Sequence, residues 1–245
     1  MNLVLFHPGE YDAAERVARL PKGDARAEHL FKVLHVREGQ AFRAGVANGA
    51  SGLARIEGEE GACWRIRCAF DRPAEARPRV DILLAMPRPK ALPRILEDLA
   101  ALSFGTLWLF AASKTRGAYG TSHKAEAAAV EAAVWAGLQQ GRHTRVPEVR
   151  TLEGLSLGAL PLAEYAARLV AHPTEEASLP LLQSLRGLPA AARVLLAIGP
   201  EPGWTDGELK RLFCRHFLPF SLGPAPLRTH AAAVALLSAL QLHLG

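Results

Sequence analysis

The chain has 245 residues, of which 49% are hydrophobic and 22% are charged. That is enough apolar material for one large or two small packed domains, and the composition argues against a disordered chain. The formal net charge is +5, with 29 Lys and Arg against 24 Asp and Glu, which favours a polyanionic partner but is also compatible with a basic enzyme that never binds nucleic acid.

Neither a membrane span nor a secretory signal is expected. No apolar run reaches the roughly 18–20 residues that a bilayer requires, and residues 1–10 lack a basic segment followed by an apolar one. The three cysteines are Cys63, Cys68 and Cys214, and they form no CxxC pair. They are therefore interpreted as buried free thiols in a reducing compartment, the cytoplasm, and no metal site is expected.

The first seventy residues carry the pattern of a small β-barrel. A short helix is expected at 25–33, because its apolar residues recur at helical spacing. Asn48-Gly49 is a strong hairpin signal, since both residues tolerate positive φ. Strands are predicted at 41–47, 52–57 and 62–70. Residues 71–78 contain two prolines and no apolar periodicity, and are interpreted as a linker between domains.

After the linker, apolar strands alternate with helices. Such alternation predicts an α/β fold whose parallel sheet is covered by helices on both faces. Strands are expected at 80–86, 106–110, 167–171 and 194–198, and helices at 92–102, 124–140 and 230–244.

Residues 195–208 combine a buried strand, a glycine-containing turn and a helix start. Thr205 is placed as an N-cap with Glu208 three positions later, which is a capping box. In open α/β sheets, ligands bind just beyond the carboxyl ends of strands, and glycine lets backbone approach a ligand closely. A purely structural turn, held rigid by its prolines, remains an alternative at this stage.

Two further segments could bind an anionic group. At 220–232, the polar residues Arg228, Thr229 and His230 stand at the positive end of a nearly uncharged helix, although Thr229 could simply cap that helix. At 138–147, Gly141 is expected to end a helix, and Arg142 and a nearby arginine could bind phosphate or be solvated. Residues 86–150 hold nine Lys/Arg against five Asp/Glu and are the better candidate for an RNA backbone contact.

Four segments together resemble the RsmE family, in the SPOUT superfamily of knotted methyltransferases. They lie in the order of the family's motifs over nearly the whole chain. The segments are HLFKVL at 29–34, QQGR at 139–142 with Pro147, IGPE at 198–201 with Gly203, Thr205 and Glu208, and LG at 222–223 with Leu227, Arg228, Thr229 and Ala232.

The resemblance implies a fold and an activity. It implies a PUA-like, RNA-binding β-barrel at 1–72 and a SPOUT domain with a trefoil knot at 79–245. It implies methylation of N3 of a uridine in 16S ribosomal RNA, with S-adenosylmethionine as the cofactor. The expected partners are ribosomal RNA or the small ribosomal subunit, rather than DNA, and a second copy of the chain bound through the C-terminal domain.

The resemblance also assigns site residues. Arg228 and Arg142 are the candidates for holding the target base or its phosphate, and Glu201 and His230 for accepting a proton. The cofactor contacts are expected at His172, Ile198, Gly199, Pro200, Glu201, Gly203, Leu222, Gly223, Leu227 and Thr229.

Two substitutions keep other functions open. Pro202 stands where the family has a second glycine, and His230 stands where it has an acidic residue. The alternatives are a SPOUT methyltransferase for another RNA, and an RNA-binding or ribosome-assembly protein with a degraded cofactor site.

Overall fold

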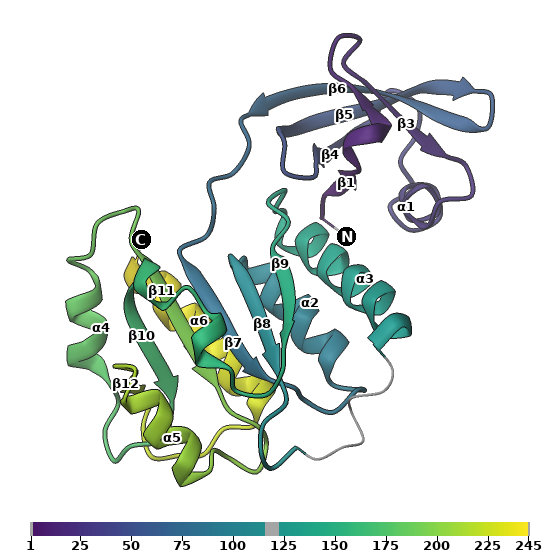
Figure 1. Ribbon diagram of the computed structural model, residues 1–245. Helices are drawn as coiled ribbons and strands as arrows, with labels where there is room; N and C mark the ends of the chain where they lie inside the picture. Colours follow the sequence, from purple (N-terminus) through teal and green to yellow (C-terminus); the bar gives the residue numbers. More distant parts are fainter. Residues whose placement is uncertain (1, 116–122, 245) are drawn as a thin grey trace. The chain divides into compact units, whose positions relative to one another are not determined.

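The computed structural model describes residues 2–115 and 123–244 and contains two compact units. Unit 1 is Met1–Ala76 together with Trp135–Val146, and unit 2 is Arg77–Val134 together with Pro147–Gly245. Helix α3 (His123–Gly141) therefore contributes residues to both units, which its uninterrupted alanine-rich sequence does not reveal (Figure 1). The domain boundaries expected from the sequence, 1–72 and 79–245, stay a prediction.

Unit 1 is built on a curled six-stranded sheet in the order β1-β4-β5-β6-β3-β2. The pair β1–β4 is parallel and the remaining neighbours are antiparallel. Inward-facing residues such as Ile56, Ile66 and Cys68 alternate with exposed ones, because successive side chains of a strand point to opposite faces. The strands are β1 (Val4–Phe6), β2 (Tyr11–Asp12), β3 (Val17–Pro21), β4 (Ala41–Val46), β5 (Ser51–Glu60) and β6 (Cys63–Arg72).

The expected short helix begins as an α-helix and continues as a wider turn. Helix α1 (Ala25–Glu28) is followed by a π-helical segment, η2 (His29–Val33), in which the Leu34 N–H donates to the His29 carbonyl at 2.9 Å. The side chain of Arg26 in α1 is largely enclosed, with 12% of its surface exposed. Its guanidinium donates to Glu10 at 2.6 Å and to the Leu5 carbonyl at 2.7 Å, and so ties the helix to the sheet.

Residues 135–146 complete unit 1 by closing over the β4–β5 hairpin. The expected turn is present, with Asn48 at φ 57°. Its backbone N–H donates to the Thr144 carbonyl at 2.7 Å, and the Thr144 hydroxyl donates to the Gly49 carbonyl at 2.9 Å. The hairpin is therefore fixed by a segment almost one hundred residues away, and the sequence-based interpretation of 138–147 as a solvated helix end misses this contact.

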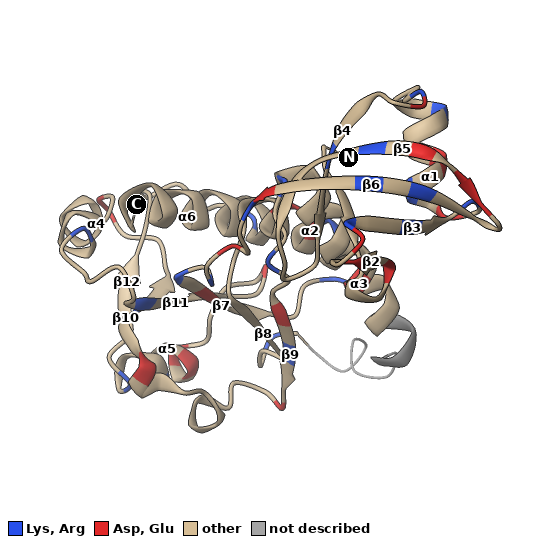
Figure 2. Cartoon of the chain, turned by 90° about the horizontal axis from the view of Figure 1, so that it is seen from above, with Lys and Arg blue, Asp and Glu red and all other residues tan. Residues whose placement is uncertain are grey.

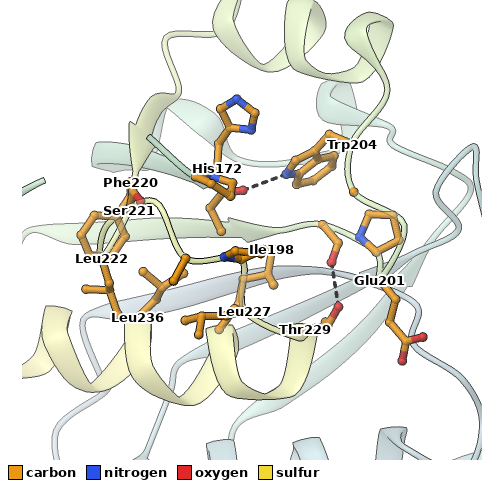
Figure 3. Close-up of a pocket in the computed structure, with 18 of the residues that line it drawn as sticks. His172, Ile198, Glu201, Trp204, Phe220, Ser221, Leu222, Leu227, Thr229 and Leu236 are labelled. Carbon is orange, nitrogen blue, oxygen red and sulfur yellow. Dashed lines mark hydrogen bonds between the residues drawn. The ribbon is translucent and has the colours of Figure 1, made fainter. Parts of the chain in front are cut away.

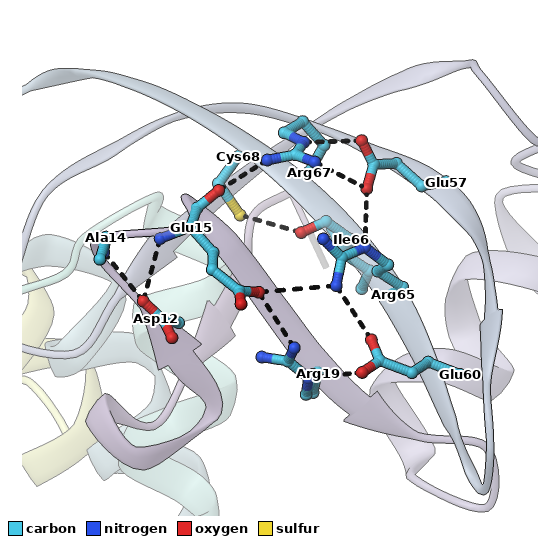
Figure 4. A network of polar contacts seen from close by, with 10 residues as sticks. All are labelled: Asp12, Ala14, Glu15, Arg19, Glu57, Glu60, Arg65, Ile66, Arg67 and Cys68. Carbon is cyan, nitrogen blue, oxygen red and sulfur yellow. Dashed lines mark hydrogen bonds and ion pairs between the residues drawn. The ribbon is translucent and has the colours of Figure 1, made fainter.

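Strands β3, β5 and β6 carry both basic and acidic residues (Figure 2). Together with the turn before β3, these residues form an ion network in which positive and negative charges balance (Figure 4). The Arg65 Nε atom lies 3.1 Å from Glu57, and the Arg19 Nη2 atom lies 3.1 Å from Glu15. Exposed pairs of this kind stabilise a fold only modestly. Three arginines alternate with three glutamates in the network: Arg19, Arg65, Arg67, Glu15, Glu57 and Glu60.

Unit 2 contains a six-stranded sheet, all parallel, in the order β12-β10-β11-β7-β8-β9. The parallel sheet expected from the apolar strands is confirmed. The strands are β7 (Val80–Ala85), β8 (Thr106–Phe110), β9 (Glu148–Leu152), β10 (Tyr165–Ala171), β11 (Arg193–Ile198) and β12 (Leu218–Phe220). The expected linker is shorter than predicted, because Asp71 and Arg72 belong to β6.

Helices cover both faces of this sheet (Figure 1). Helices α2 (Leu92–Leu102), α4 (Leu179–Leu185) and α6 (Thr229–Leu244) pack together, and α6 also contacts β7 and β11. On the other face, Leu212 of α5 (Asp206–Phe213) joins a core that includes Leu83 and Leu195. No helix in the described part of the chain is long and apolar enough to cross a membrane.

One fully buried carboxylate fixes the amino-terminal ends of the central strands. Asp81 has 0% exposure and accepts from the Tyr165 hydroxyl at 2.7 Å, the Thr106 N–H at 2.7 Å and the Arg77 guanidinium at 2.7 Å. Arg193 adds an ion pair. A buried charge without such partners would cost several kcal/mol, on the order of 3–5 when one partner of a pair is lost. The network therefore locks β7, β8, β10 and β11 together.

The cysteines differ in their surroundings. Cys68 is buried, Cys63 is half-buried, and Cys214 is exposed. The expectation of a buried thiol is thus wrong for Cys214, because this residue follows the last turn of α5 on the side away from the core residue Leu212.

Candidate functional site

A cavity of about 370 Å³ lies at the carboxyl ends of β10, β11 and β12 (Figure 3). Because these neighbouring strands are parallel, the loops that follow them meet at the same edge of the sheet. The N-terminal part of α6 closes the cavity from below in the view of Figure 3, where Thr229 and Leu236 are labelled, and Ala232 also lines the cavity. Three loops and one helix, rather than one continuous motif, therefore form the site.

The turn after β11 is held in place by the indole of Trp204. A Cβ atom added to Gly199 would lie 2.8 Å from that ring, so only glycine fits here. The indole N–H donates to the Ala171 carbonyl at 3.0 Å, which joins this turn to the end of β10. The ring also stacks on Phe110, with centroids 5.9 Å apart. Gly203, at φ 75°, completes the turn in a conformation that favours glycine.

The expected capping box at the start of α5 is confirmed. The Thr205 hydroxyl accepts from the Glu208 N–H at 3.2 Å, and the Glu208 carboxylate accepts from the Thr205 N–H at 2.8 Å. The same carboxylate accepts from the Ser113 N–H at 2.9 Å, beyond the end of β8. Burial opposes ionisation of Glu208, but the hydrogen bonds from Ser113 and Thr205 outweigh it, so the pKa of Glu208 lies below its usual range. Glu208 thus acts as both a helix cap and a tie between two loops.

The loop after β12 is organised around the Ser221 hydroxyl. This group accepts from the Thr174 N–H at 3.2 Å and the Gly223 N–H at 3.1 Å, and donates to the Gly223 carbonyl at 2.8 Å. Gly223 has φ 124°, which a residue with a side chain adopts rarely. The backbone that faces the cavity here is therefore fixed before any ligand arrives.

Thr229 links α6 to the turn after β11. It is the first residue of the helix rather than its cap, so the capping role considered for it is wrong. Its hydroxyl donates to the Gly199 carbonyl at 3.4 Å, a long hydrogen bond that crosses the cavity floor (Figure 3). The first helical hydrogen bond instead runs from the Ala232 N–H to the Arg228 carbonyl at 2.8 Å.

The cavity walls are mainly apolar, with polar backbone at the turns. Leu222 and Leu227 keep 43% and 48% of their surface exposed, although both line the cavity. Aliphatic walls with a few fixed polar groups suit a flat heteroaromatic ligand with polar edges. All ten residues expected to contact a cofactor line this cavity: His172, Ile198, Gly199, Pro200, Glu201, Gly203, Leu222, Gly223, Leu227 and Thr229.

The four expected catalytic residues are not all brought together. Glu201 lines the cavity, and its carboxylate lies 3.0 Å from the Arg88 Nε atom. Arg228 is exposed and stands between two lining residues without lining the cavity itself. His230 points its Nε2 atom at Asp98 of α2, 2.6 Å away, so that nitrogen is already engaged. Arg142 belongs to unit 1, whereas the other three belong to unit 2.

The expected end of α3 at Gly141 is confirmed, since Gly141 is the last helical residue. The next residue, Arg142, takes the left-handed conformation at φ 64°. An arginine in this conformation is strained relative to glycine.

Comparison with known proteins identifies the family. The RNA methyltransferase domain family matches residues 74–241. The chain belongs to this RNA methyltransferase family. The match spans most of unit 2, including every loop of the cavity. The expected methyltransferase class is thereby confirmed.

Individual relatives match this RNA methyltransferase over nearly all of the given sequence. The chain is 28% identical over 240 residues to the ribosomal RNA small subunit methyltransferase E of Treponema pallidum, covering 96% of this chain and 88% of the relative. The methyltransferase E of Neisseria gonorrhoeae, whose structure is bound to S-adenosylmethionine, has a TM-score of 0.75 at 18% identity over 98% of this chain and 97% of that one. A putative methyltransferase of Legionella pneumophila, in complex with the same cofactor, has a TM-score of 0.75 at 22% identity, over 99% and 97%. The resemblance to the RsmE family is confirmed.

Sequence reasoning about this RNA methyltransferase missed several residues of the cavity. Trp204, Ser221 and Leu236 line it, and the first two hold its loops in place. A tryptophan directly after a glycine turn is a signal that could have been noticed. Ser221 carries no comparable signal, because its partner Thr174 is 47 residues away.

Proposed function

We propose that the chain transfers the methyl group of S-adenosylmethionine to N3 of a uridine in 16S ribosomal RNA. The observation that carries the proposal is the cavity at the ends of β10, β11 and β12, lined by the glycine turns that resemble the RsmE motifs. The name of the Treponema pallidum relative supports a substrate in small-subunit ribosomal RNA. The S-adenosylmethionine bound in the Neisseria gonorrhoeae and Legionella pneumophila structures supports the same compound as the methyl donor here.

The residues present fit this cofactor. Leu222, Leu227 and Leu236 offer apolar surface for the adenine. The carbonyl oxygens of Gly199 and Gly223 each accept one hydrogen bond within the chain and keep a second lone pair for the polar edges of the ligand. Pro202 does not line the cavity, so the substitution that suggested a degraded site leaves it open. When bound, the cofactor supplies a methyl group on a sulfonium. The chain contributes orientation, since the loops are already fixed by hydrogen bonds.

We assign the polar residues the following roles. Arg228 holds the target base or an adjacent phosphate, supported by its exposed position beside the cavity. Arg142 holds RNA phosphate from unit 1. Glu201 accepts the N3 proton, supported by its place in the cavity wall. His230 orients α6 against α2 through Asp98, which replaces the role of proton acceptor considered for it.

The finer fold and assembly are part of the same proposal. We infer a PUA-like, RNA-binding barrel at 1–72 and a SPOUT domain at 79–245 whose C-terminal segment forms a trefoil knot, both supported by the RsmE resemblance. We also infer a cytoplasmic homodimer joined through α6. Part of α6 is covered within the chain, but Ala231, Ala235, Ser238 and Leu242 recur at helical spacing along its less buried side. The exposed fraction of Leu242 is 78%.

Two measurements test the function. Calorimetry with S-adenosylhomocysteine should show binding to the full chain. Single-turnover reactions with small ribosomal subunits should place one methyl group on a uridine, as mapped by mass spectrometry of nuclease fragments. Absence of heat at millimolar ligand would favour a ribosome-assembly protein with a degraded site. Binding without methylation of this substrate would favour a different RNA target.

A further inference from the structure

A second cavity adjoins the first at the shared residue Glu201. It has a volume of about 200 Å³ and lies beyond the carboxyl ends of β7 and β8. Only one acidic side chain, that of Glu201, contributes to its wall among the described residues. Its lining is Met86, Pro87, Arg88, Lys114, Thr115, Glu201 and Pro202. A molecule in this cavity would therefore lie next to a ligand in the first one, with Glu201 touching both.

The polar groups of this second cavity are fixed by contacts with the turn after β11. The Lys114 ammonium donates to the Pro202 carbonyl at 3.2 Å and to the Trp204 carbonyl at 3.0 Å. An ammonium has three N–H groups, so one remains for a ligand. The Arg88 Nε atom lies 3.0 Å from a Glu201 carboxylate oxygen, as an ion pair, and the guanidinium makes no hydrogen bond to any other described residue, so its terminal NH₂ groups can meet a ligand. The cavity thus offers two cationic donors and one carboxylate acceptor.

We propose that this second cavity binds the target uracil, with Arg88 and Lys114 donating to its two carbonyl oxygens and Glu201 accepting from N3–H. The inference rests on the proposed function. The Watson–Crick edge of uracil presents a carbonyl acceptor, the N3–H donor and a second carbonyl acceptor, in that order. A site complements this edge when it places a donor, an acceptor and a donor opposite these three groups. Arg88, Glu201 and Lys114 supply that set.

The same three side chains disfavour other ligands in the second cavity. Cytosine presents an unprotonated N3, which would face the Glu201 carboxylate without a hydrogen to share. A phosphate would bring negative charge against that carboxylate, although it would suit the two cations. The carboxylate is therefore the group that selects a neutral base with a central N–H. Arg88 and Glu201 are specificity-determining residues in this arrangement.

The groups also account for the chemical step. The N3 proton passes to the Glu201 carboxylate, which is 41% exposed and can release it to water. The negative charge left on the base spreads to its two carbonyl oxygens, where Arg88 and Lys114 stabilise it. N3 then forms a bond to the methyl carbon as the carbon–sulfur bond breaks, and that electron pair stays on sulfur. The products are N3-methyluridine and S-adenosylhomocysteine.

Arg88→Met tests the inference in single-turnover methylation of small ribosomal subunits across pH. A neighbouring cation favours the deprotonated base, so its removal raises the pKa of N3 and moves the ascending limb of the rate profile to higher pH. At pH 7 the rate should fall on the order of tenfold to a hundredfold. Affinity for S-adenosylhomocysteine should change by less than about twofold, because Arg88 does not line the first cavity. Arg186→Met is the matched control, since Arg186 is exposed on unit 2 and lines neither cavity.

A binding measurement supplies a readout that does not depend on turnover. Subunits reconstituted with cytidine at the target position should bind the wild-type chain more weakly than native subunits, in the presence of S-adenosylhomocysteine. Arg88→Met should reduce this preference, and Arg186→Met should retain it.

Three results would overturn the inference. A rate profile for Arg88→Met that falls uniformly, without a shift along the pH axis, would point to a phosphate contact instead. Equal affinity of the wild-type chain for uridine and cytidine subunits would remove the claimed specificity. Lack of methylation by the wild-type chain would overturn the proposed function itself, and this inference with it, whereas a normal wild-type rate with an unchanged Arg88→Met rate would overturn the inference alone.

Discussion

Replacing Glu208 by glutamine should destabilise unit 2 far more than the loss of one surface charge. The carboxylate has 3% exposure and accepts from the Ser113 N–H at 2.9 Å, the Thr205 N–H at 2.8 Å and the Thr205 hydroxyl at 2.9 Å. A glutamine can keep its oxygen on Ser113, but its NH₂ group then faces the Thr205 N–H, where two donors repel. The substitution leaves one buried donor unpaired and removes two charge-assisted hydrogen bonds.

The magnitude follows from those contacts. A hydrogen bond to a charged group contributes about 1.5–3 kcal/mol, and an unpaired buried donor costs about 1–3 kcal/mol. Partial relaxation and the retained Ser113 contact reduce the sum, so we expect a loss of about 2–4 kcal/mol in the free energy of unfolding. Asp206→Asn removes the same charge from the same first turn of α5, but Asp206 is exposed. Its loss should cost only about 0.3–1 kcal/mol.

Urea denaturation at pH 7, followed by circular dichroism, measures both substitutions. The pH dependence gives a second check. Because the pKa of Glu208 is depressed in the folded chain, its stabilising contribution is complete above the unfolded value of about 4.3 and is lost as pH falls through the folded value. The difference between wild type and Glu208→Gln should therefore narrow on acidification. Equal effects of Glu208→Gln and Asp206→Asn at pH 7 would refute this account of the buried carboxylate.

Three further predictions concern other parts of the chain. Arg228→Ala should lower single-turnover methylation by on the order of tenfold to a hundredfold while S-adenosylhomocysteine affinity stays nearly constant, and near-equal rates would contradict the proposed role. Ala235→Arg, on the less buried side of α6, should convert a dimer to a monomer in light scattering, and a monomeric wild-type chain would exclude the dimer. Maleimide labelling at pH 7 should modify exposed Cys214 quickly and Cys68 slowly, because burial raises the pKa of Cys68 to about 12, and equal rates would contradict that burial.

Long apolar elements of unit 2 could be predicted from the sequence closely. The expected bounds of α2 and β8, 92–102 and 106–110, coincide with those observed. Short or atypical strands could not be predicted. Strand β12 contains Pro219 and the exposed Leu218, a pattern that resembles a loop. Pro219 is tolerated because β12 is an edge strand, where a residue without a backbone N–H need not donate a hydrogen bond to a neighbouring strand.

The residues of the candidate site show the same difference between features encoded by a local sequence pattern and features that are not. Its cavity-lining turns were predictable, because glycines follow apolar strands that must end at one edge of a parallel sheet. Contacts that depend on distant partners were not. His230 meets Asp98 across 132 residues, and no local pattern encodes that pairing. The second cavity was likewise hidden, since Arg88 and Glu201 come from loops after different strands.

The close approach of Gly199 and Trp204 restricts how this cavity can evolve. Any side chain at position 199 would collide with the indole, because a Cβ atom added to Gly199 would lie 2.8 Å from the ring atoms of Trp204. A smaller residue at position 204 would make room for that side chain. It would also remove the hydrogen bond from the indole N–H to the Ala171 carbonyl, which joins the turn after β11 to the end of β10. Positions 199 and 204 therefore cannot be substituted independently, and homologous chains should either retain both residues or change both together. Directed evolution for bulkier cofactor analogues would accordingly have to randomise positions 171, 199 and 204 as one set.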